Sequence, residues 1–175
     1  IAAAAAYAHG SARQPLFLVE QLVNDATSRT DKSAAAERAA LADLLGAAIA
    51  ECRTSAAKAF FCKRLAMIGT PEQVPAIAPV LADKQAAMMA RLALERIEGP
   101  AAAAALRGAL PKLEGDLKIG AINSIGERAD ADAVPALAPL LHDAATATAA
   151  VSALGKIGTA SAATILVAAR QEAAE

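Results

Sequence analysis

The chain has 175 residues, with 17 Lys and Arg against 18 Asp and Glu, and 56% of its residues are hydrophobic. A balance of this kind argues against nucleic-acid binding, which requires a basic surface. No run of about 18 large apolar residues occurs, so the sequence predicts no transmembrane helix. Much of the hydrophobic fraction is alanine, which favours helices but buries little apolar surface, and thin, closely packed helices are therefore expected.

The N-terminal part predicts an alanine-rich start and two helices. Residues 1–10 lack the basic and leucine-rich regions of an intact signal peptide, and they are interpreted as a frayed helical tail rather than the remnant of a cleaved one. Helices are expected over residues 15–24 and 33–51, with a loop over residues 25–32 between them. Their apolar residues are expected to form buried stripes: Leu16, Leu18, Val19, Leu22, Val23, Leu41, Leu44, Leu45 and Ile49.

The two cysteines, Cys52 and Cys62, do not form a disulfide framework or a CxxC motif. If the chain turns near residues 53–55 between antiparallel helices, the two cysteines are offset by about 9 Å along the helix axes. This offset exceeds the roughly 7 Å limit between Cα atoms for a disulfide. We therefore expect free, mostly buried thiols.

Four segments share an aliphatic pair spaced three apart and a glycine that follows it: LAMIG, LERIEG, INSIG and LGKIG. Their glycines are Gly69, Gly99, Gly126 and Gly158, at intervals of 30, 27 and 32 residues. The spacing of the pair places both aliphatic residues on one helix face. Each glycine is predicted to end its helix in the left-handed conformation.

A ten-residue phrase also occurs twice: VPAIAPVLAD at residues 74–83 returns as VPALAPLLHD at residues 134–143, with seven identical positions. Proline is tolerated in the first turn of a helix, but a second proline four residues later cannot donate its hydrogen bond. Pro79 and Pro139 therefore predict that these helices bend near their starts or are preceded by a short 3₁₀ turn. The final residues of the two copies, Asp83 and Asp143, are predicted to cap the helices that follow.

Each glycine segment is followed by capping signals, which predict where the second helix of a pair begins. Thr70 and Gln73 form a T-x-x-Q capping box. Asp130 or Asp132 is the predicted cap in the third repeat, and in the fourth the predicted cap is Thr159 or Ser161. The resulting layout is a series of helix pairs over residues 56–82, 84–113, 116–142 and 144–172.

Three segments of this array resemble a known family: GTPEQVPAI followed by LAD, SIGERADADAVPALAPLLHD, and LGKIGTASAATIL. They are similar to HEAT-like repeats of the phycobilisome-lyase type, over about residues 56–172. The resemblance implies an α-solenoid with a binding role, but it does not imply lyase activity, because fold alone does not determine function. Residues 93–130 are similar to bacterial HEAT-repeat proteins that are often exported. That similarity implies an exported or periplasmic location, with the cytoplasm as the alternative.

Enzyme signatures of this fold find little support in the sequence. A di-iron centre requires paired His-Glu motifs, whereas the only histidines are His9 and His142, followed by Gly10 and Asp143. The chain has no Trp and one Tyr, which argues against a DNA-glycosylase groove and against a pocket for a bilin chromophore. His142 and Asp143 are interpreted as helix-terminus residues rather than as a catalytic or metal-binding pair. No catalytic residue, metal ligand or cofactor is predicted.

Charged residues on or just after the first helices of successive pairs are the remaining candidates for a functional surface. One interpretation is a solvated face with pairs such as Arg91–Glu95. The alternative is a ridge that binds an acidic or mixed-charge partner. The predicted partner-binding residues are Arg64, Arg91, Arg96, Lys118, Arg128 and His142.

Together these patterns predict an all-α, right-handed α-solenoid of about four HEAT-like helix pairs, preceded by an N-terminal helical pair. The expected division is an N-terminal helical segment over residues 1–55 and a repeat array over residues 56–175, within one continuous domain. The expected function is a protein-binding scaffold, or a subunit of a larger assembly, in which the second helices line a concave face. The alternative is a lyase-like enzyme that processes a small molecule or cofactor in a pocket between repeats.

Overall fold

A computed structural model describes residues 1–172, without the side chain of Lys32, and all regular elements in this range are helical. The absence of strands from these residues confirms the predicted all-α fold of HEAT-like helix pairs. The chain groups into two compact units, Ile1–Ala105 and Leu106–Glu175. The expected division after residue 55 and the single continuous domain stay predictions.

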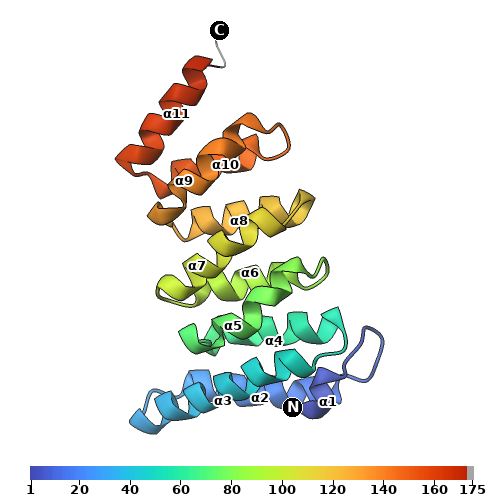
Figure 1. Ribbon diagram of the computed structural model, residues 1–175. Helices are drawn as coiled ribbons and strands as arrows, with labels where there is room; N and C mark the ends of the chain where they lie inside the picture. Colours follow the sequence, from blue (N-terminus) through green and yellow to red (C-terminus); the bar gives the residue numbers. More distant parts are fainter. Residues whose placement is uncertain (173–175) are drawn as a thin grey trace. The chain divides into compact units, whose positions relative to one another are not determined.

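Unit 1 contains three successive helix pairs and a short N-terminal helix (Figure 1). Helix α4 contacts both α3 and α6 and so lies at the centre of the unit. The elements are α1 (Ala2–Ala5), α2 (Gln14–Ser28), α3 (Lys32–Glu51), α4 (Ser55–Ile68), the 3₁₀-helix η1 (Pro71–Gln73), α5 (Val74–Ile77), the 3₁₀-helix η2 (Ala78–Ala82), α6 (Ala87–Arg96) and the first part of α7 (Pro100–Ala109).

Unit 2 continues the same alternation. Helix α10 contacts α8, η5 and α11. The elements after α7 are the 3₁₀-helix η3 (Leu110–Lys112), α8 (Gly115–Glu127), the 3₁₀-helix η4 (Ala131–Ala133), α9 (Val134–Leu137), the 3₁₀-helix η5 (Ala138–His142), α10 (Ala147–Ile157) and α11 (Ala160–Glu172). We call α3, α5–η2, α7–η3, α9–η5 and α11 the second helices, because each is the second member of its pair in chain order, and α2, α4, α6, α8 and α10 the first helices.

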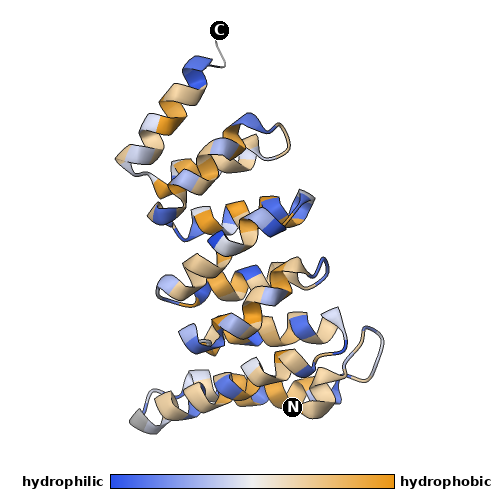
Figure 2. Cartoon of the chain, in the orientation of Figure 1, coloured by the Kyte–Doolittle hydropathy of each residue, from blue (hydrophilic) through white to orange (hydrophobic). Residues whose placement is uncertain are grey.

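The core of each unit combines a few large apolar side chains with many alanines. In unit 1, Phe61, Leu65 and Leu94 are completely buried, and in unit 2 the same holds for Ile122 and Ile125. Figure 2 shows hydrophobic residues in the middle of α11 and hydrophilic residues at its C-terminal end. No helix among residues 1–172 is long and apolar enough to span a membrane.

Two expectations for the N-terminal part are wrong. The alanine-rich start is not a frayed tail, because α1 buries Ala4 and Ala5, and the carbonyl of Ala5 accepts a hydrogen bond from the Arg53 N–H at 3.4 Å. The predicted loop over residues 25–32 is shorter than expected, since α2 continues to Ser28. In its last turns the Ser28 hydroxyl donates to the Asp25 carbonyl at 2.9 Å, so polar residues continue the helix.

The predicted buried stripes are only partly correct. Leu16, Val19 and Val23 are buried as expected, but Leu18 and Leu22 are 60% and 44% exposed, and on α3 the predicted core residue Leu44 is 56% exposed. The first three recur at spacings of three and four, which places them on one face of α2. Leu18 and Leu22 lie outside the face of α2 that contacts α3 and α4.

The capping box at Thr70 and Gln73 is confirmed, and it connects two repeats. The Gln73 side chain is 3% exposed, and its Oε1 accepts a hydrogen bond from the Thr70 N–H at 2.8 Å. Its Nε2 donates to Oδ1 of Asp43 on α3 at 2.7 Å. Both the oxygen and the nitrogen of this buried amide therefore have hydrogen-bond partners, as burial of a polar group requires. Thr159 is likewise confirmed as a cap, since its Oγ1 accepts from the Ala162 N–H at 3.2 Å.

Gly158 ends α10 in the left-handed conformation with φ of 64°, as predicted. Gly99 also has a positive φ, of 88°, although α6 ends before it at Arg96. Gly69 ends α4 with φ of −66°, and Gly126 lies within α8. A Cβ on Gly126 would lie 2.8 Å from Cα of Ala153 on α10. On Gly69 a Cβ would lie 2.5 Å from the Leu65 carbonyl oxygen. The absence of a side chain at these two positions therefore serves close packing and not a left-handed turn.

Candidate functional site

The repeated phrase forms a short α-helix that continues as a 3₁₀-helix in both copies: α5 into η2, and α9 into η5. Pro79 and Pro139 lie in the first turn of the 3₁₀ segments, where the missing N–H and the ring prevent continuation of the α-helix. The predicted 3₁₀ turns before these helices are confirmed by η1 and η4, which directly precede α5 and α9. The prolines of both copies are exposed, so each second helix presents proline rings at its surface.

Three apolar grooves lie between successive second helices. The first groove, in unit 1, measures about 380 Å³ between the end of α3 and the α5–η2 segment. It is lined by Ile49, Ala50, Cys52, Lys58, Pro75, Ala76, Pro79 and Val80. Its single charged residue, Lys58, comes from α4.

The charge of Lys58 is balanced by Asp83, whose Oδ2 lies 3.3 Å from Nζ of Lys58. The same Oδ2 accepts a hydrogen bond from Oγ of Ser55 at 2.9 Å. Oδ1 of Asp83 accepts from the N–H groups of Gln85 and Ala86 at 3.1 and 3.2 Å, which confirms the predicted cap. Burial acts to raise the pKa of Asp83, but these hydrogen bonds outweigh it and lower the pKa below its usual value. The carboxylate is therefore ionised and committed to protein partners.

The second groove, in unit 2, measures about 360 Å³ and lies between α7–η3 and α9–η5. It is lined by Arg107, Leu110, Pro111, Lys118, Ala136 and Leu140. Nη1 of Arg107 lies 2.6 Å from Oδ1 of Asp130, whose side chain is 7% exposed. The Asp130 carboxylate therefore binds Arg107. The prediction that Asp130 or Asp132 caps this helix is wrong, since η4 has no side-chain cap.

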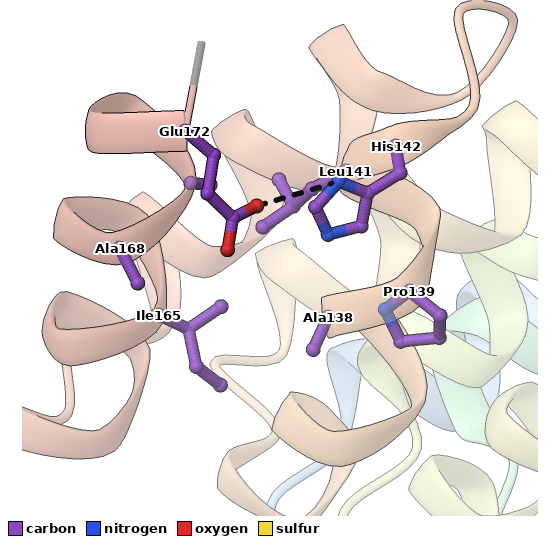
Figure 3. A pocket seen from close by; sticks show the side chains of 8 residues that line it. Ala138, Pro139, Leu141, His142, Ile165, Ala168 and Glu172 are labelled. Carbon is purple, nitrogen blue, oxygen red and sulfur yellow. Dashed lines mark ion pairs between the residues drawn. The ribbon is translucent and has the colours of Figure 1, made fainter. Parts of the chain in front are cut away.

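Figure 3 shows the third groove, about 380 Å³ in volume, between η5 and α11 in unit 2. Its lining residues are Ala138, Pro139, Leu141, His142, Ile165, Ala168, Ala169 and Glu172. Nδ1 of His142 lies 3.8 Å from Oε2 of Glu172 across the groove, and both side chains are about two-thirds exposed. This separation is longer than a hydrogen bond, so the two groups form at most an open ion pair at the rim.

The neighbouring Asp143 forms its hydrogen bonds with the loop that follows it. Its Oδ1 accepts from the Ala145 N–H at 3.0 Å, and its Oδ2 accepts from Oγ1 of Thr146 at 3.1 Å. Asp143 thus stabilises the turn before α10, whose N-cap residue is Thr146 and not the predicted Asp143. His142 lies in the last turn of η5, where a basic side chain is favourable.

The predicted partner-binding residues lie in different environments. Nη2 of Arg64 binds Oε1 of Glu20 at 3.0 Å, and its guanidinium lies over the Phe60 ring at 5.1 Å from the centroid. Burial lowers the pKa of Arg91, and the charge of Glu95 opposes this shift.

The other four predicted residues lie in α6 and in unit 2. Arg96 is exposed in the last turn of α6, and Arg128 follows α8 and is half-buried. Lys118 and His142 line the second and third grooves. A role for any of the six in binding a partner stays a prediction. Arg107 is a groove residue that the sequence interpretation missed, because the first copy has no cation at the corresponding position.

Both cysteines are free thiols, as predicted, with Cys62 buried and Cys52 half-buried. Burial raises the pKa of Cys52 to about 11 and that of Cys62 to about 12. A thiolate is the reactive form, so these thiols are poor nucleophiles near neutral pH. Among the residues that the structure describes, no three His, Cys, Asp or Glu side chains are grouped as metal ligands.

We expect both thiols to react slowly with iodoacetamide in the native protein at about pH 8. With pKa values of about 11 and 12, at most about one thiol in a thousand is ionised under these conditions. Mass spectrometry of time-quenched samples measures the rate of labelling. In denaturant both cysteines are expected to react at the rate of a free thiol. Native labelling of Cys62 at that rate would contradict its burial.

Comparison with known proteins gives one family match. Residues 109–175 match the family described as HEAT repeats, which supports a HEAT-like repeat protein. No curated protein and no solved structure matches the chain.

Proposed function

We propose that this chain is a non-catalytic scaffold that binds another protein through the grooves between its second helices. HEAT repeats commonly mediate protein interactions, and repeat arrays offer extended surfaces for that purpose. The observation that carries the proposal is the recurrence of the groove. Three grooves of similar volume lie between successive second helices, one in unit 1 and two in unit 2.

The chemistry of the grooves suits peptide side chains. Each combines apolar residues with one or two ionisable groups, such as Lys58 in the first groove and His142 in the third. Exposed prolines carry no N–H donor and add rigid apolar surface. A protein segment with apolar side chains can bury them there while its polar groups stay near the rim.

The catalytic alternative, a lyase-like enzyme, has weaker support. Enzymes need a nucleophile, acid or base placed within reach of a partner group. The two thiols have raised pKa values, and His142 is separated from Glu172 by 3.8 Å at an exposed rim. We therefore propose the scaffold role. The proposed location is exported or periplasmic, and it rests on the resemblance of residues 93–130 to bacterial HEAT-repeat proteins that are often exported.

Site-specific photo-crosslinking tests this function. A photoreactive residue placed at Ala76 in the first groove or at Ala136 in the second is expected to crosslink a partner protein, identified by mass spectrometry. Matched control positions are Met88 and Val151, which are 61% and 49% exposed on the first helices α6 and α10. Crosslinks confined to the controls would overturn the proposal. So would native mass spectrometry that finds a bound small molecule and no partner protein.

A further inference from the structure

The first and second grooves are two copies of one site, 60 residues apart in the sequence. Lys58 in the first corresponds to Lys118 in the second, and Val80 corresponds to Leu140. The helices that carry these lysines, α4 and α8, also begin 60 residues apart. The charged groups of the two grooves can therefore be compared position by position.

In the first copy the lysine is neutralised. Oδ2 of Asp83 lies 3.3 Å from Nζ of Lys58 and also accepts from Oγ of Ser55 at 2.9 Å. The Asp83 side chain is only 16% exposed, so this carboxylate is held against α4. The first groove consequently offers little positive charge to a partner.

In the second copy the equivalent carboxylate faces another way. Asp143 corresponds to Asp83, but its Oδ2 accepts from Oγ1 of Thr146, where the first copy has Ala86. On α8, Gly115 stands in the place of Ser55, so the hydroxyl donor that held the carboxylate is also missing.

These two replacements leave Lys118 free. No carboxylate among residues 1–172 forms an ion pair with it. Its ammonium group, half-buried at the wall of the groove, is therefore available to a ligand.

Arg107 places a guanidinium group in the groove, at the position that Ala47 occupies in the first copy. Its Nη1 is held by the buried Asp130 at 2.6 Å, which fixes the guanidinium in place. Its Nη2 lies 3.6 Å from Asp132, whose side chain is 83% exposed. An ion pair exposed to this degree contributes little, so an incoming carboxylate can replace Asp132 on Nη2.

We propose that the second groove selects a partner segment in which an acidic side chain adjoins an apolar one. The carboxylate binds Lys118 and Nη2 of Arg107, and the apolar side chain packs against Leu110 and Leu140. Guanidinium and ammonium groups together suit a carboxylate, because each donates charge-assisted hydrogen bonds. This inference rests on the proposed function, and it assigns the first groove to segments without an acidic requirement.

Peptide titrations followed by NMR test this selectivity. The probes are three capped peptides of the pattern alanine–leucine–X–leucine–alanine, with glutamate, glutamine or lysine at X. The glutamate peptide is expected to shift the amide signals of Lys118, Ala136 and Leu140. We expect it to bind about three- to tenfold more tightly than the glutamine peptide, and the lysine peptide to bind least.

Variants at equivalent positions supply the matched control. Lys118→Met should abolish the preference for glutamate over glutamine, whereas Lys58→Met in the first groove should leave it unchanged. Lys118→Glu should transfer the preference to the lysine peptide. Both positions are solvent-accessible, and thermal melting of each variant checks that the fold is retained.

Three results would overturn the inference. They are equal affinity for the glutamate and glutamine peptides, an unchanged preference in Lys118→Met, and displacement of the glutamate peptide by an equal concentration of acetate. The last result would indicate a general anion site. If the crosslinking at Ala136 still captures a partner protein, the scaffold function stands and only the acidic selectivity fails. If neither experiment detects binding, both proposals fail.

Discussion

Replacing Phe61 with alanine is expected to lower the free energy of unfolding of unit 1 by about 3–5 kcal/mol. The Phe61 side chain is completely buried on α4, which contacts both α3 and α6. Loss of the ring leaves a cavity in a packed core, and the cost of such a cavity adds to the lost burial. Urea denaturation followed by far-UV circular dichroism measures the change.

Phe60→Ala is the matched control for this substitution. Phe60 is half-buried, packs edge-on against Phe61 with ring centroids 5.5 Å apart, and lies under the guanidinium of Arg64. Its loss removes less buried surface, so a smaller effect is expected. Because the chain forms two compact units, hydrogen exchange of α4 amides should accompany the denaturation curves. A larger loss of stability in Phe60→Ala would contradict the assigned centre of the core.

Gly126→Ala is expected to destabilise unit 2 by about 1–3 kcal/mol. Helix propensity alone predicts the opposite, because alanine is favoured over glycine by about 1 kcal/mol within a helix. The added Cβ would lie 2.8 Å from Cα of Ala153, and a backbone atom of a packed helix cannot rotate away. Helices α8 and α10 would have to separate, and the lost packing outweighs the gain in propensity.

Gly155→Ala provides the comparison on α10 itself. No atom lies within 4 Å of the position of its Cβ, so we expect this substitution to stabilise the protein by about 0.5–1 kcal/mol. Thermal and urea denaturation of both variants should therefore give shifts of opposite sign. Two stabilising shifts would refute the close approach of α8 and α10.

Local signals in the sequence predicted several capping residues and proline positions correctly. Thr70 forms the predicted capping box with Gln73, the Thr159 hydroxyl accepts from the Ala162 N–H, and Asp83 accepts from two backbone N–H groups just before α6. Pro79 lies where the α-helix becomes a 3₁₀-helix. Such features depend on residues a few positions apart in the chain, and one sequence contains all the information that they need.

Predictions that depended on packing were less successful. Four glycines looked equivalent in sequence, yet Gly158 supplies a left-handed cap and Gly126 lets two helices approach. Leu18 and Leu22 looked like core residues and are exposed. In each case the deciding contact comes from a helix remote in sequence, and periodicity within one segment does not specify which arc of the helix that neighbour covers.

The same difference between local and tertiary information applies to the residues of the second groove. Lys118 was predicted as one of a row of charges, but it belongs to a groove whose other cation, Arg107, had no signal in the repeat. The pairing of Lys58 with Asp83, and its loss for Lys118, could not be inferred from the identical aspartates in the two phrases.

By itself, the sequence determined that this protein is an array of short helix pairs, because repeated caps, prolines and aliphatic spacings act over one or two turns of chain. Tertiary structure alone decided which glycines serve packing, where the grooves lie, and which of two equivalent lysines is neutralised. The physical reason is that hydrogen bonds and ion pairs depend on distances of a few ångströms between different helices. Two exchanges, Thr146 in the place of Ala86 and Gly115 in the place of Ser55, accompany the different hydrogen bonds of the two equivalent carboxylates.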